Sequence, residues 1–304
     1  MTATPRPVAD GRSETLGDLL GARDGSGWMA LVWRILLWAL IGLVIAFLLA
    51  SVLPTTLPLN TLPGLVGFLI AARIVRGLEG RPDASLGFPL DRAAPRDALL
   101  GTALGVAVAL VAVALMAVAG AVRWRSEPGG ALAWTQVAAW SVWLLLIPAA
   151  AEEAMLRGYP FQALAEAKGP AWALAVTSIG FAALHLPNPG IGPLALANLA
   201  AAGLFLGVLY LRTGNLWWPT GAHLGWNWAH AFLADLPVSG LEIVDAPGLE
   251  AVTRGPAWLS GGPFGPEGSV LATAVVLAAA AWTWRTRRLP SRAGGTSGKD
   301  GEDE

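Results

Sequence analysis

The stretch WSVWLLLIPAAAEEAMLR at residues 140–157 runs from an apolar segment into charged residues without losing a helical pattern. It places Glu152, Glu153 and Arg157 at the end of a segment that otherwise has the composition of a membrane span. An ionisable side chain in the hydrocarbon core costs roughly 2.5–3.5 kcal/mol even on a mild insertion scale, and such residues mark functional sites. We therefore expect the function of the chain to lie here and at similar clusters nearby.

Two further polar clusters lie on later apolar segments. Phe181 and His185 are four residues apart, which places an aromatic ring one helical turn from an imidazole. His223, Asn227 and His230 are spaced i, i+4 and i+7 and form one stripe on a helix. A polar seam that only holds helices together is the alternative, since interhelical hydrogen bonds of about 0.6 kcal/mol occur in membranes. Because the clusters contain all three histidines of the chain, we favour a functional site.

Composition limits the class of protein. Of 304 residues, 55% are hydrophobic and only 13% are charged, which indicates an all-α polytopic membrane protein rather than a soluble domain. The net charge of −1 offers no basic face for a phosphate backbone, so nucleic acid is excluded as a partner. The absence of cysteine excludes disulfides, thiolate metal sites and cysteine nucleophiles. Any hydrolytic chemistry must use Glu, His, Asn, Ser or water.

Hydropathy predicts about eight membrane-spanning helices, each near the ~20 residues that cross the hydrocarbon core. Short loops rich in Lys and Arg stay in the cytoplasm, and with an even number of spans only Arg123, Arg125 and Arg254 fall outside, while Arg34 lies within the first span. We therefore expect a multi-pass protein of the plasma (inner) membrane with both termini cytoplasmic. The predicted spans are 27–53, 58–75, 98–122, 131–151 with a polar continuation to about 167, 170–187, 193–211, 216–235 and 269–284.

The predicted spans divide the chain into six segments. The first residues are polar and rich in Gly and Arg, which predicts disorder. The segments are 1–26 as a disordered cytoplasmic N-terminus, 27–130 with the first three spans, 131–235 as a catalytic core with spans four to seven, 236–268 as an external Gly/Pro-rich loop, 269–284 as the last span and 285–304 as a charged cytoplasmic tail.

The two glutamates of the first cluster differ in whether they have a charged partner on the same helix face. Glu153 and Arg157 are four residues apart on one helix face, so they can form an ion pair. Glu152 is offset by about 100° on the helix and lacks that partner, which suits it to act as a general base near neutral pH. Pro148 is expected to kink or interrupt this helix. The alternative interpretation is that both glutamates lie in water at a cytoplasmic helix end.

Two mechanisms can use these groups. In the first, Glu152 and His185 polarise a water that attacks a peptide carbonyl, while His223 and Asn227 donate hydrogen bonds to the oxyanion. In the second, Glu152, His185 and His223 hold a divalent metal such as zinc, whose bound water is the nucleophile. The sequence contains no H-E-x-x-H motif, the strongest zinc signature. We favour the glutamate-activated water and leave the metal as the alternative.

The flanking sequence carries a family resemblance. The motifs are EEAMLRGYPF at 152–161, FAALHLPN at 181–188, and LYLRTGNLW at 209–217 leading to His223 and Asn227. In this order and on separate spans, they resemble the CPBP family. That family comprises CAAX prenyl endopeptidases and bacteriocin-processing (Abi-like) or bacteriocin-immunity membrane proteins, and it includes the Ras-converting enzyme.

The resemblance covers about residues 131–235 and implies an all-helical intramembrane endopeptidase whose site opens toward the cytoplasm. It implies that Glu152 and His185 activate water and that His223 and Asn227 stabilise the oxyanion. The substrate would be a peptide or membrane protein in contact with membrane lipid, and prenylated tails are among the candidates. The supporting residues would be Glu153, Arg157, Phe181 and His230, the last of which lies outside the motif and is expected to pack or hydrogen-bond behind the site.

If the predicted spans are straight, Glu152 and His185 lie at different depths in the membrane. Glu152 falls near the cytoplasmic end of a straight fourth helix, whereas His185 falls toward the outer end of a straight fifth helix. They can meet if the fourth helix continues to about Ala167, so that Glu152 lies well inside the bilayer. The apolar residues that follow Glu152 favour such a long helix, and we expect it.

Two other functions use the same residues differently. A transporter could use intramembrane Glu and His as a proton or ion relay, although the sequence lacks the repeated pair of broken helices typical of transporters. Ion-driven uptake in vesicles would favour it. A non-catalytic scaffold or immunity protein would use the polar clusters for packing, and a double variant of Glu152 and His185 would then complement as well as the wild type.

Overall fold

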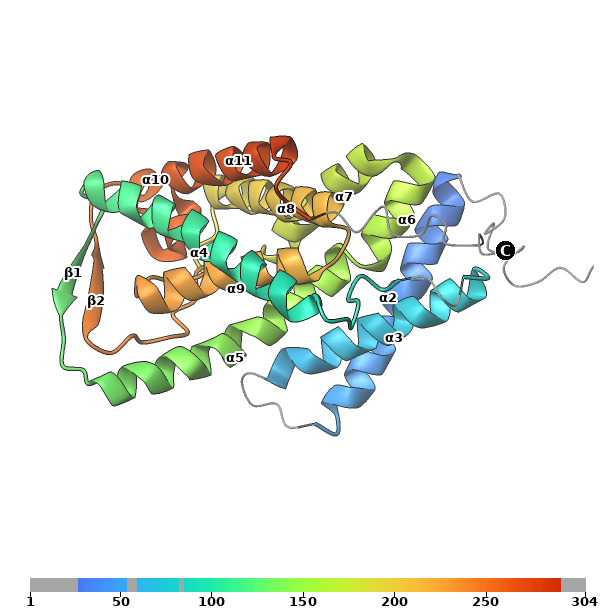
Figure 1. Cartoon of the computed structure of the whole chain (residues 1–304), viewed down its shortest axis with the longest axis horizontal. Coiled ribbons are helices and arrows are strands. Elements are labelled where there is room, and N and C mark those ends of the chain that lie inside the picture. Colours follow the sequence, from blue (N-terminus) through green and yellow to red (C-terminus); the bar gives the residue numbers. More distant parts are fainter. Residues whose placement is uncertain (1–26, 54–58, 82–84, 291–304) are drawn as a thin grey trace, which may run out of the picture.

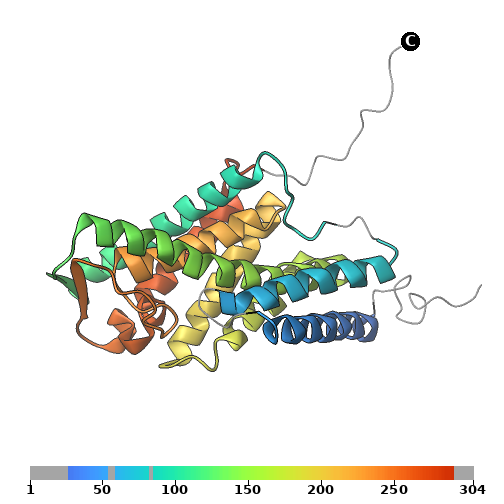
Figure 2. The same cartoon turned by 90° about the horizontal axis from the view of Figure 1, so that it is seen from below.

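The computed structural model describes residues 27–53, 59–81 and 85–290 as a bundle of helices with a small sheet at one end (Figure 1). The predicted N-terminal segment, residues 1–26, and most of the charged tail lie outside the described residues. The hairpin of α2 (Trp28–Ala50) and α3 (Leu62–Leu78) lies beside the remaining helices rather than among them (Figure 2). The catalytic core predicted from the sequence therefore belongs to the larger group of helices.

The described helices follow the predicted spans with shifts of a few residues. In chain order they are α2 (Trp28–Ala50), the 3-10 turn η1 (Leu59–Thr61), α3 (Leu62–Leu78), α4 (Ala94–Val118), α5 (Ala131–Leu156), α6 (Tyr159–Lys168), α7 (Pro170–Leu184), α8 (Pro193–Thr213), α9 (Trp217–Trp228) with the π-helical turn η2 (Ala229–Leu233), α10 (Ala257–Ser260), the 3-10 turns η3 (Gly262–Phe264) and η4 (Pro266–Gly268), and α11 (Val270–Arg285).

Within the described residues, five helical segments are long and apolar enough to cross a membrane. The helices α7 and α11 are apolar but shorter, and α9 has 12 residues before its π-helical turn. The structure is therefore that of a helical membrane protein, and the count of eight crossings stays a prediction. The five segments are Trp28–Ala50, Leu59–Leu78, Ala94–Val118, Ala131–Lys168 and Pro193–Thr213.

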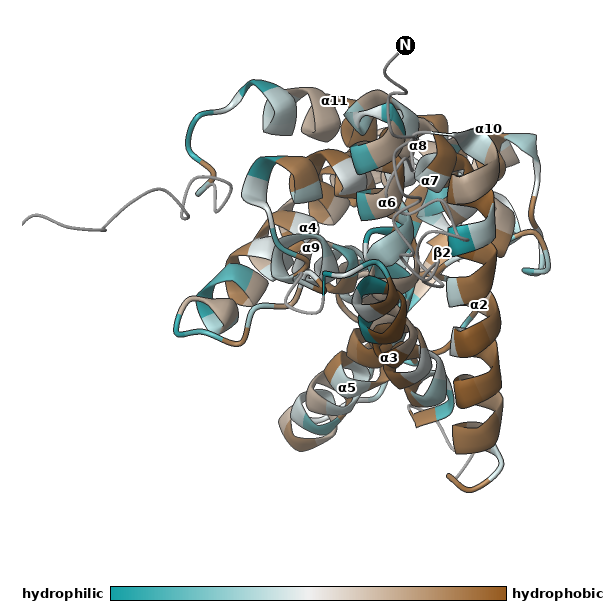
Figure 3. Cartoon of the chain, turned by 90° about the vertical axis from the view of Figure 1, so that its right-hand side faces the viewer, coloured by the Kyte–Doolittle hydropathy of each residue, from teal (hydrophilic) through white to brown (hydrophobic). Residues whose placement is uncertain are grey.

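The outer faces of several helices are apolar, as expected for contact with lipid. On α2, Leu40 is 59% exposed and Phe47 is 74% exposed. The hydropathy colouring shows α2 as an almost continuous hydrophobic surface (Figure 3). A side chain of this kind facing water would be costly, so this surface is suited to a hydrocarbon environment.

The expectation of a purely helical chain was wrong in one detail. Strand β1 (Val122–Ser126) pairs antiparallel with strand β2 (Leu249–Thr253), and Arg125 lies opposite Glu250. Opposite charges on facing strand positions stabilise such a ladder. The pair joins the end of α4 to the predicted external loop, so this loop is tied to the bundle.

The fourth predicted helical segment reaches Lys168, close to the expected Ala167, but it is broken after Leu156 into two helices. The chain runs through Pro148 without interrupting α5, but α5 ends at Leu156 and a separate helix, α6, begins at Tyr159. A Cβ atom on Gly158 would lie 2.1 Å from the carbonyl oxygen of Ala154. Only glycine fits this break, which is why the helix changes direction just after the first polar cluster.

Buried ion pairs attach the α2–α3 hairpin to α6. Glu79 of the α3 end accepts hydrogen bonds from Arg34 (2.8 Å), Arg76 (3.0 Å) and the Tyr159 hydroxyl (2.5 Å). Arg76 also binds Glu166 of α6 through both terminal nitrogens at 2.9 Å. Arg76 is only 1% exposed. Because removing one partner of a buried pair leaves a charge unpaired, these helices are held together strongly.

Helices α4 and α9 pack with their backbones in direct contact through two glycine pairs. Gly101 and Gly105 of α4 face Gly221 and Gly225 of α9, and a Cβ atom on Gly105 would lie 2.0 Å from the carbonyl oxygen of Ala222. Small residues four apart allow such close approach between membrane helices. The contact fixes the rotation of α9, which carries His223 and Asn227.

Gly105→Ala should lower the unfolding free energy by about 1–3 kcal/mol, because the added methyl group must displace the backbone of α9. Gly77→Ala is the matched control, since nothing lies within 4 Å of a Cβ atom built at Gly77. Alanine in a helix is favoured over glycine, so this variant should unfold at the same temperature or higher. Thermal unfolding in detergent measures both. Equal melting temperatures would contradict the glycine contact.

Candidate active site

Glu152 faces two imidazole rings from two other helices. Its Oε2 atom lies 3.9 Å from Nε2 of His185 and 3.8 Å from Nε2 of His223. Among the described residues this Oε2 atom has no hydrogen-bond partner. Separations of this size are too long for direct hydrogen bonds and are suited to a bridging water. The sequence clusters on α5, α7 and α9 therefore meet at one point.

The hydrogen bonds of the two rings fix where their protons lie. Nδ1 of His185 lies 2.8 Å from the carbonyl oxygen of Phe181, and Nδ1 of His223 lies 3.1 Å from Oε1 of Glu153. Both oxygens accept, because a carbonyl has no proton and the Glu153 carboxylate is ion-paired with Arg157. Each Nδ1 is therefore the donor, and in a neutral ring Nε2 carries a lone pair toward Glu152.

The predicted pair of Glu153 and Arg157 is confirmed. Nη1 of Arg157 donates to Oε1 of Glu153 at 3.0 Å, and both side chains are fully buried. Nη2 of Arg157 donates to the carbonyl oxygen of Gly203 on α8 at 2.8 Å. The guanidinium also lies 4.8 Å from the centre of the Phe181 ring, which is itself 4.9 Å from the His185 ring. The pair therefore contacts His223 directly, through Glu153, and His185 indirectly, through the Phe181 ring.

A cavity of about 450 Å³ opens in front of these groups. Glu152, His185, His223 and Asn227 all line it, whereas His230 does not. The remaining wall is largely apolar, as in most small-molecule and peptide sites. Its apolar lining residues include Leu144, Leu145, Leu184, Phe205, Leu206 and Val276.

Residues 133–229 match the family described as type II CAAX prenyl endopeptidase, Rce1-like. This match supports membership of the segment in that family. No curated protein and no solved structure matches the chain. The matched segment contains Glu152, His185, His223 and Asn227, and it ends one residue before His230. The type II CAAX prenyl endopeptidases are proteases, and the clusters that we identified from the sequence lie in the segment that matches this family.

The length of α7 explains how the Rce1-like segment brings its second motif to the first. With 15 residues, α7 is about 22 Å long, shorter than the ~30 Å hydrocarbon core. His185 directly follows the last residue of α7, so it lies at the level of Glu152 instead of at the far side of the membrane. The two residues therefore meet because the fourth segment continues through α6 to Lys168 and the short α7 returns over a similar length.

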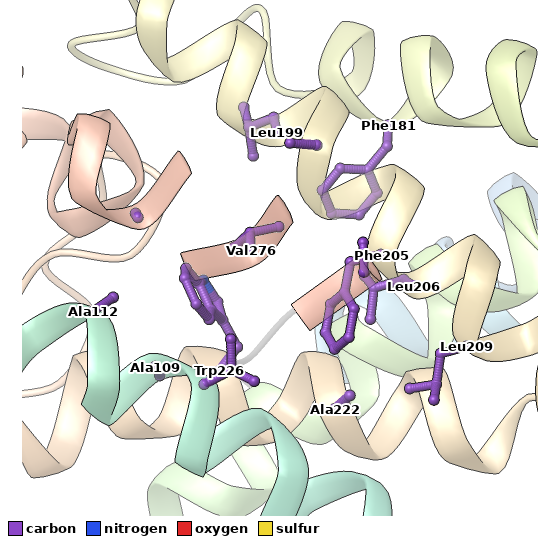
Figure 4. Close-up of a cluster of buried hydrophobic side chains, with 14 of the residues drawn as sticks. Ala109, Ala112, Phe181, Leu199, Phe205, Leu206, Leu209, Ala222, Trp226 and Val276 are labelled. Carbon is purple, nitrogen blue, oxygen red and sulfur yellow. The ribbon is translucent and has the colours of Figure 1, made fainter. Parts of the chain in front are cut away.

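His230 is separate from the Rce1-like site. Its ring lies 4.4 Å from the Trp226 ring, it is fully buried, and neither ring nitrogen has a hydrogen-bond partner among the described residues. The expectation that it packs behind the site agrees with this position. Trp226 itself lies in the core shared by α4, α8, α9 and α11, and points into the same space as Val276 (Figure 4).

The sequence reasoning missed one acidic residue of the pocket. Glu267 lies in the predicted external loop, yet it is 7% exposed and lines the same cavity. Its flanking residues, Pro266 and Gly268, indicate a turn but give no sign that the loop returns to the site. A contact between residues so far apart in sequence could not be found from local pattern.

The metal mechanism has no geometric support in the described residues of the chain. There, no group of three or more His, Cys, Asp or Glu side chains is arranged to hold a metal ion. Glu152, His185 and His223 converge, but both imidazoles face the same carboxylate oxygen at 3.8–3.9 Å. We therefore derive the chemistry of the site from its own side chains.

Arg157→Met should lower the unfolding free energy by about 3–5 kcal/mol, because it leaves the Glu153 carboxylate buried and unpaired. Arg81→Met is the matched control: its pair with Glu166 has an arginine that is 55% exposed, and exposed pairs contribute about 0–1 kcal/mol. Denaturant unfolding in detergent compares the two. Adding Glu153→Gln to Arg157→Met should restore some of the lost stability, and a double variant less stable than the single one would contradict the pairing.

Proposed function

We propose that the chain is an intramembrane endopeptidase that hydrolyses a peptide bond in a protein or peptide tail at the cytoplasmic face of the membrane. The observation that carries this proposal is the convergence of Glu152, His185 and His223 on one point of a 450 Å³ pocket. Membership of the matched segment in a protease family supports it. Both termini are proposed to be cytoplasmic.

The first half of the reaction activates a water between the carboxylate and the imidazole. His185, whose Nδ1–H donates to Phe181, accepts a hydrogen bond from the water through Nε2. Glu152 takes the proton as the water oxygen bonds to the carbonyl carbon. Glu152 is suited to this step because its Oε2 atom has no other hydrogen-bond partner among the described residues.

The second half stabilises the oxyanion and releases the amine. His223 can donate through Nε2 only when it is an imidazolium, because its Nδ1 proton is already held by Glu153. In that form Nδ1–H of His223 keeps its hydrogen bond to Oε1 of Glu153 at 3.1 Å. Asn227, one helical turn further on α9, supplies a second donor from the same pocket. Glu152 then returns its proton to the leaving amine as the carbon–nitrogen bond breaks.

The pocket also suggests a class of substrate. The apolar wall around the polar residues can exclude water and hold an apolar portion of the substrate. A prenylated tail fits this description, as does an apolar stretch of a membrane peptide. We propose that the apolar group binds along this wall while the scissile bond lies at Glu152.

Glu152→Gln should abolish cleavage while leaving the fold intact, because the amide keeps the size of the side chain but cannot accept the water proton. Glu127→Gln, an exposed residue beyond β1, is the control and should retain full activity. A comparison of C-terminal and juxtamembrane fragments by proteomics in cells carrying each variant checks this. Wild-type amounts of product from Glu152→Gln would eliminate this mechanism.

Asn227→Ala should reduce kcat by about 10²–10³ with little change in KM, as expected when one oxyanion donor is removed. Asn227→Asp has the same shape but no N–H donor, so it should be at least as slow. Steady-state kinetics on a fluorogenic peptide in detergent would measure both constants. An effect confined to KM would assign Asn227 to substrate binding instead.

A further inference from the structure

Glu267 is a second buried carboxylate in the wall of the catalytic pocket. It belongs to the turn η4 and lies outside the segment that matches the protease family. Its Oε1 atom accepts from Nε1 of Trp226 at 3.0 Å, and its Oε2 atom accepts from the backbone N–H (2.6 Å) and hydroxyl (2.7 Å) of Ser239. Three donors of this kind stabilise the ionised form of a carboxylate.

The charge of Glu267 has no cationic partner among the described residues of the chain. The pocket lining contains two carboxylates, Glu152 and Glu267, and no lysine or arginine. Glu152 has two imidazoles within 4 Å, whereas Glu267 makes no ion pair with any described residue. The buried His230 interacts with Glu267 only through space, and its ring nitrogens have no hydrogen-bond partner among the described residues. A buried carboxylate without a cation is costly. The pocket therefore has a region that favours a positive group.

The backbone holds this carboxylate in a fixed position. Val238 and Leu241 close a tight turn whose central residues, Ser239 and Gly240, have φ values of 50° and 82°. The Asn188 side chain donates to the carbonyl oxygen of Ser239 at 2.9 Å. A serine with positive φ is uncommon and persists where its surroundings fix it. A binding group fixed in this way loses little entropy when a ligand binds.

Trp226 connects this region to the catalytic residues. It lies between His223 and Asn227 on α9, its Nε1 is bound to Glu267, and it lines the pocket. An indole face attracts a cation. We propose that Glu267, together with Trp226, binds a lysine or arginine side chain of the substrate peptide and so determines its specificity.

The test uses the full chain in detergent and rests on the proposed endopeptidase function. Peptides of one sequence are compared with lysine or its uncharged isostere norleucine at each position flanking the cleaved bond. At one position the wild type should prefer lysine by about tenfold in kcat/KM, which corresponds to ~1.4 kcal/mol. Glu267→Gln should reduce that ratio to about one, by lowering kcat/KM for the lysine peptide about tenfold more than for the norleucine peptide.

Glu242→Gln is the matched control, because it removes the same charge from an exposed residue of the same loop that does not line the pocket. It should keep the tenfold preference. The proposal is overturned if the wild type shows no lysine preference at any position. It is also overturned if Glu267→Gln lowers kcat/KM equally for both peptides, as expected for a residue with only a structural role. The wild-type ratio is informative even if Glu267→Gln fails to fold.

Binding separates this inference from the proposed function. Thermal stabilisation of the Glu152→Gln variant by the two peptides should still show a preference for lysine, although this variant should cleave neither. Cleavage by Glu152→Gln would remove the catalytic mechanism and leave the lysine preference standing. Equal stabilisation by both peptides would overturn the proposed role of Glu267 and would leave the proposed endopeptidase function standing.

Discussion

The buried ion pair between Glu153 and Arg157 is the constraint on which the site depends. The pair lies on α5. Its carboxylate accepts a hydrogen bond from Nδ1 of His223 on α9. Its guanidinium donates to a backbone carbonyl of α8 and lies over the ring of Phe181 on α7. Four helices thus meet at one neutralised pair. Since neither charge can be left alone in the interior, the helices cannot separate without breaking the whole arrangement.

The ion pair and the histidine clusters could be predicted from the sequence because each depends on the spacing of residues along one helix. A carboxylate and a guanidinium four residues apart must share a helix face, and the clusters around His185 and His223 lie on helices whose apolar composition is clear. That these clusters surround one pocket was an inference from chemistry, and the distances to Glu152 agree with it. The catalytic roles rest on the same reasoning and are proposals.

Other features depend on contacts that no local pattern contains. The break after α5 requires glycine at position 158, because a Cβ atom there would collide with the carbonyl oxygen of Ala154, and only the folded backbone shows this. The strand at Val122 finds its partner more than a hundred residues later, and its five residues are too few for a strong signal. Glu267 was assigned to an external loop for the same reason. The long fourth segment was expected, but its break into α5 and α6 and its packing against the short α7 were not.

The end of α7 has a consequence for His185. The last carbonyl groups of a helix lack backbone partners, and here the backbone N–H of His185 turns to Ala182, so the carbonyl of Phe181 is bound by the imidazole of the same histidine. The ring thus acts as a C-terminal cap of its own helix. The place where the helix stops therefore selects the tautomer, and a protein family could retune this imidazole by lengthening or shortening α7 without changing any residue in the pocket.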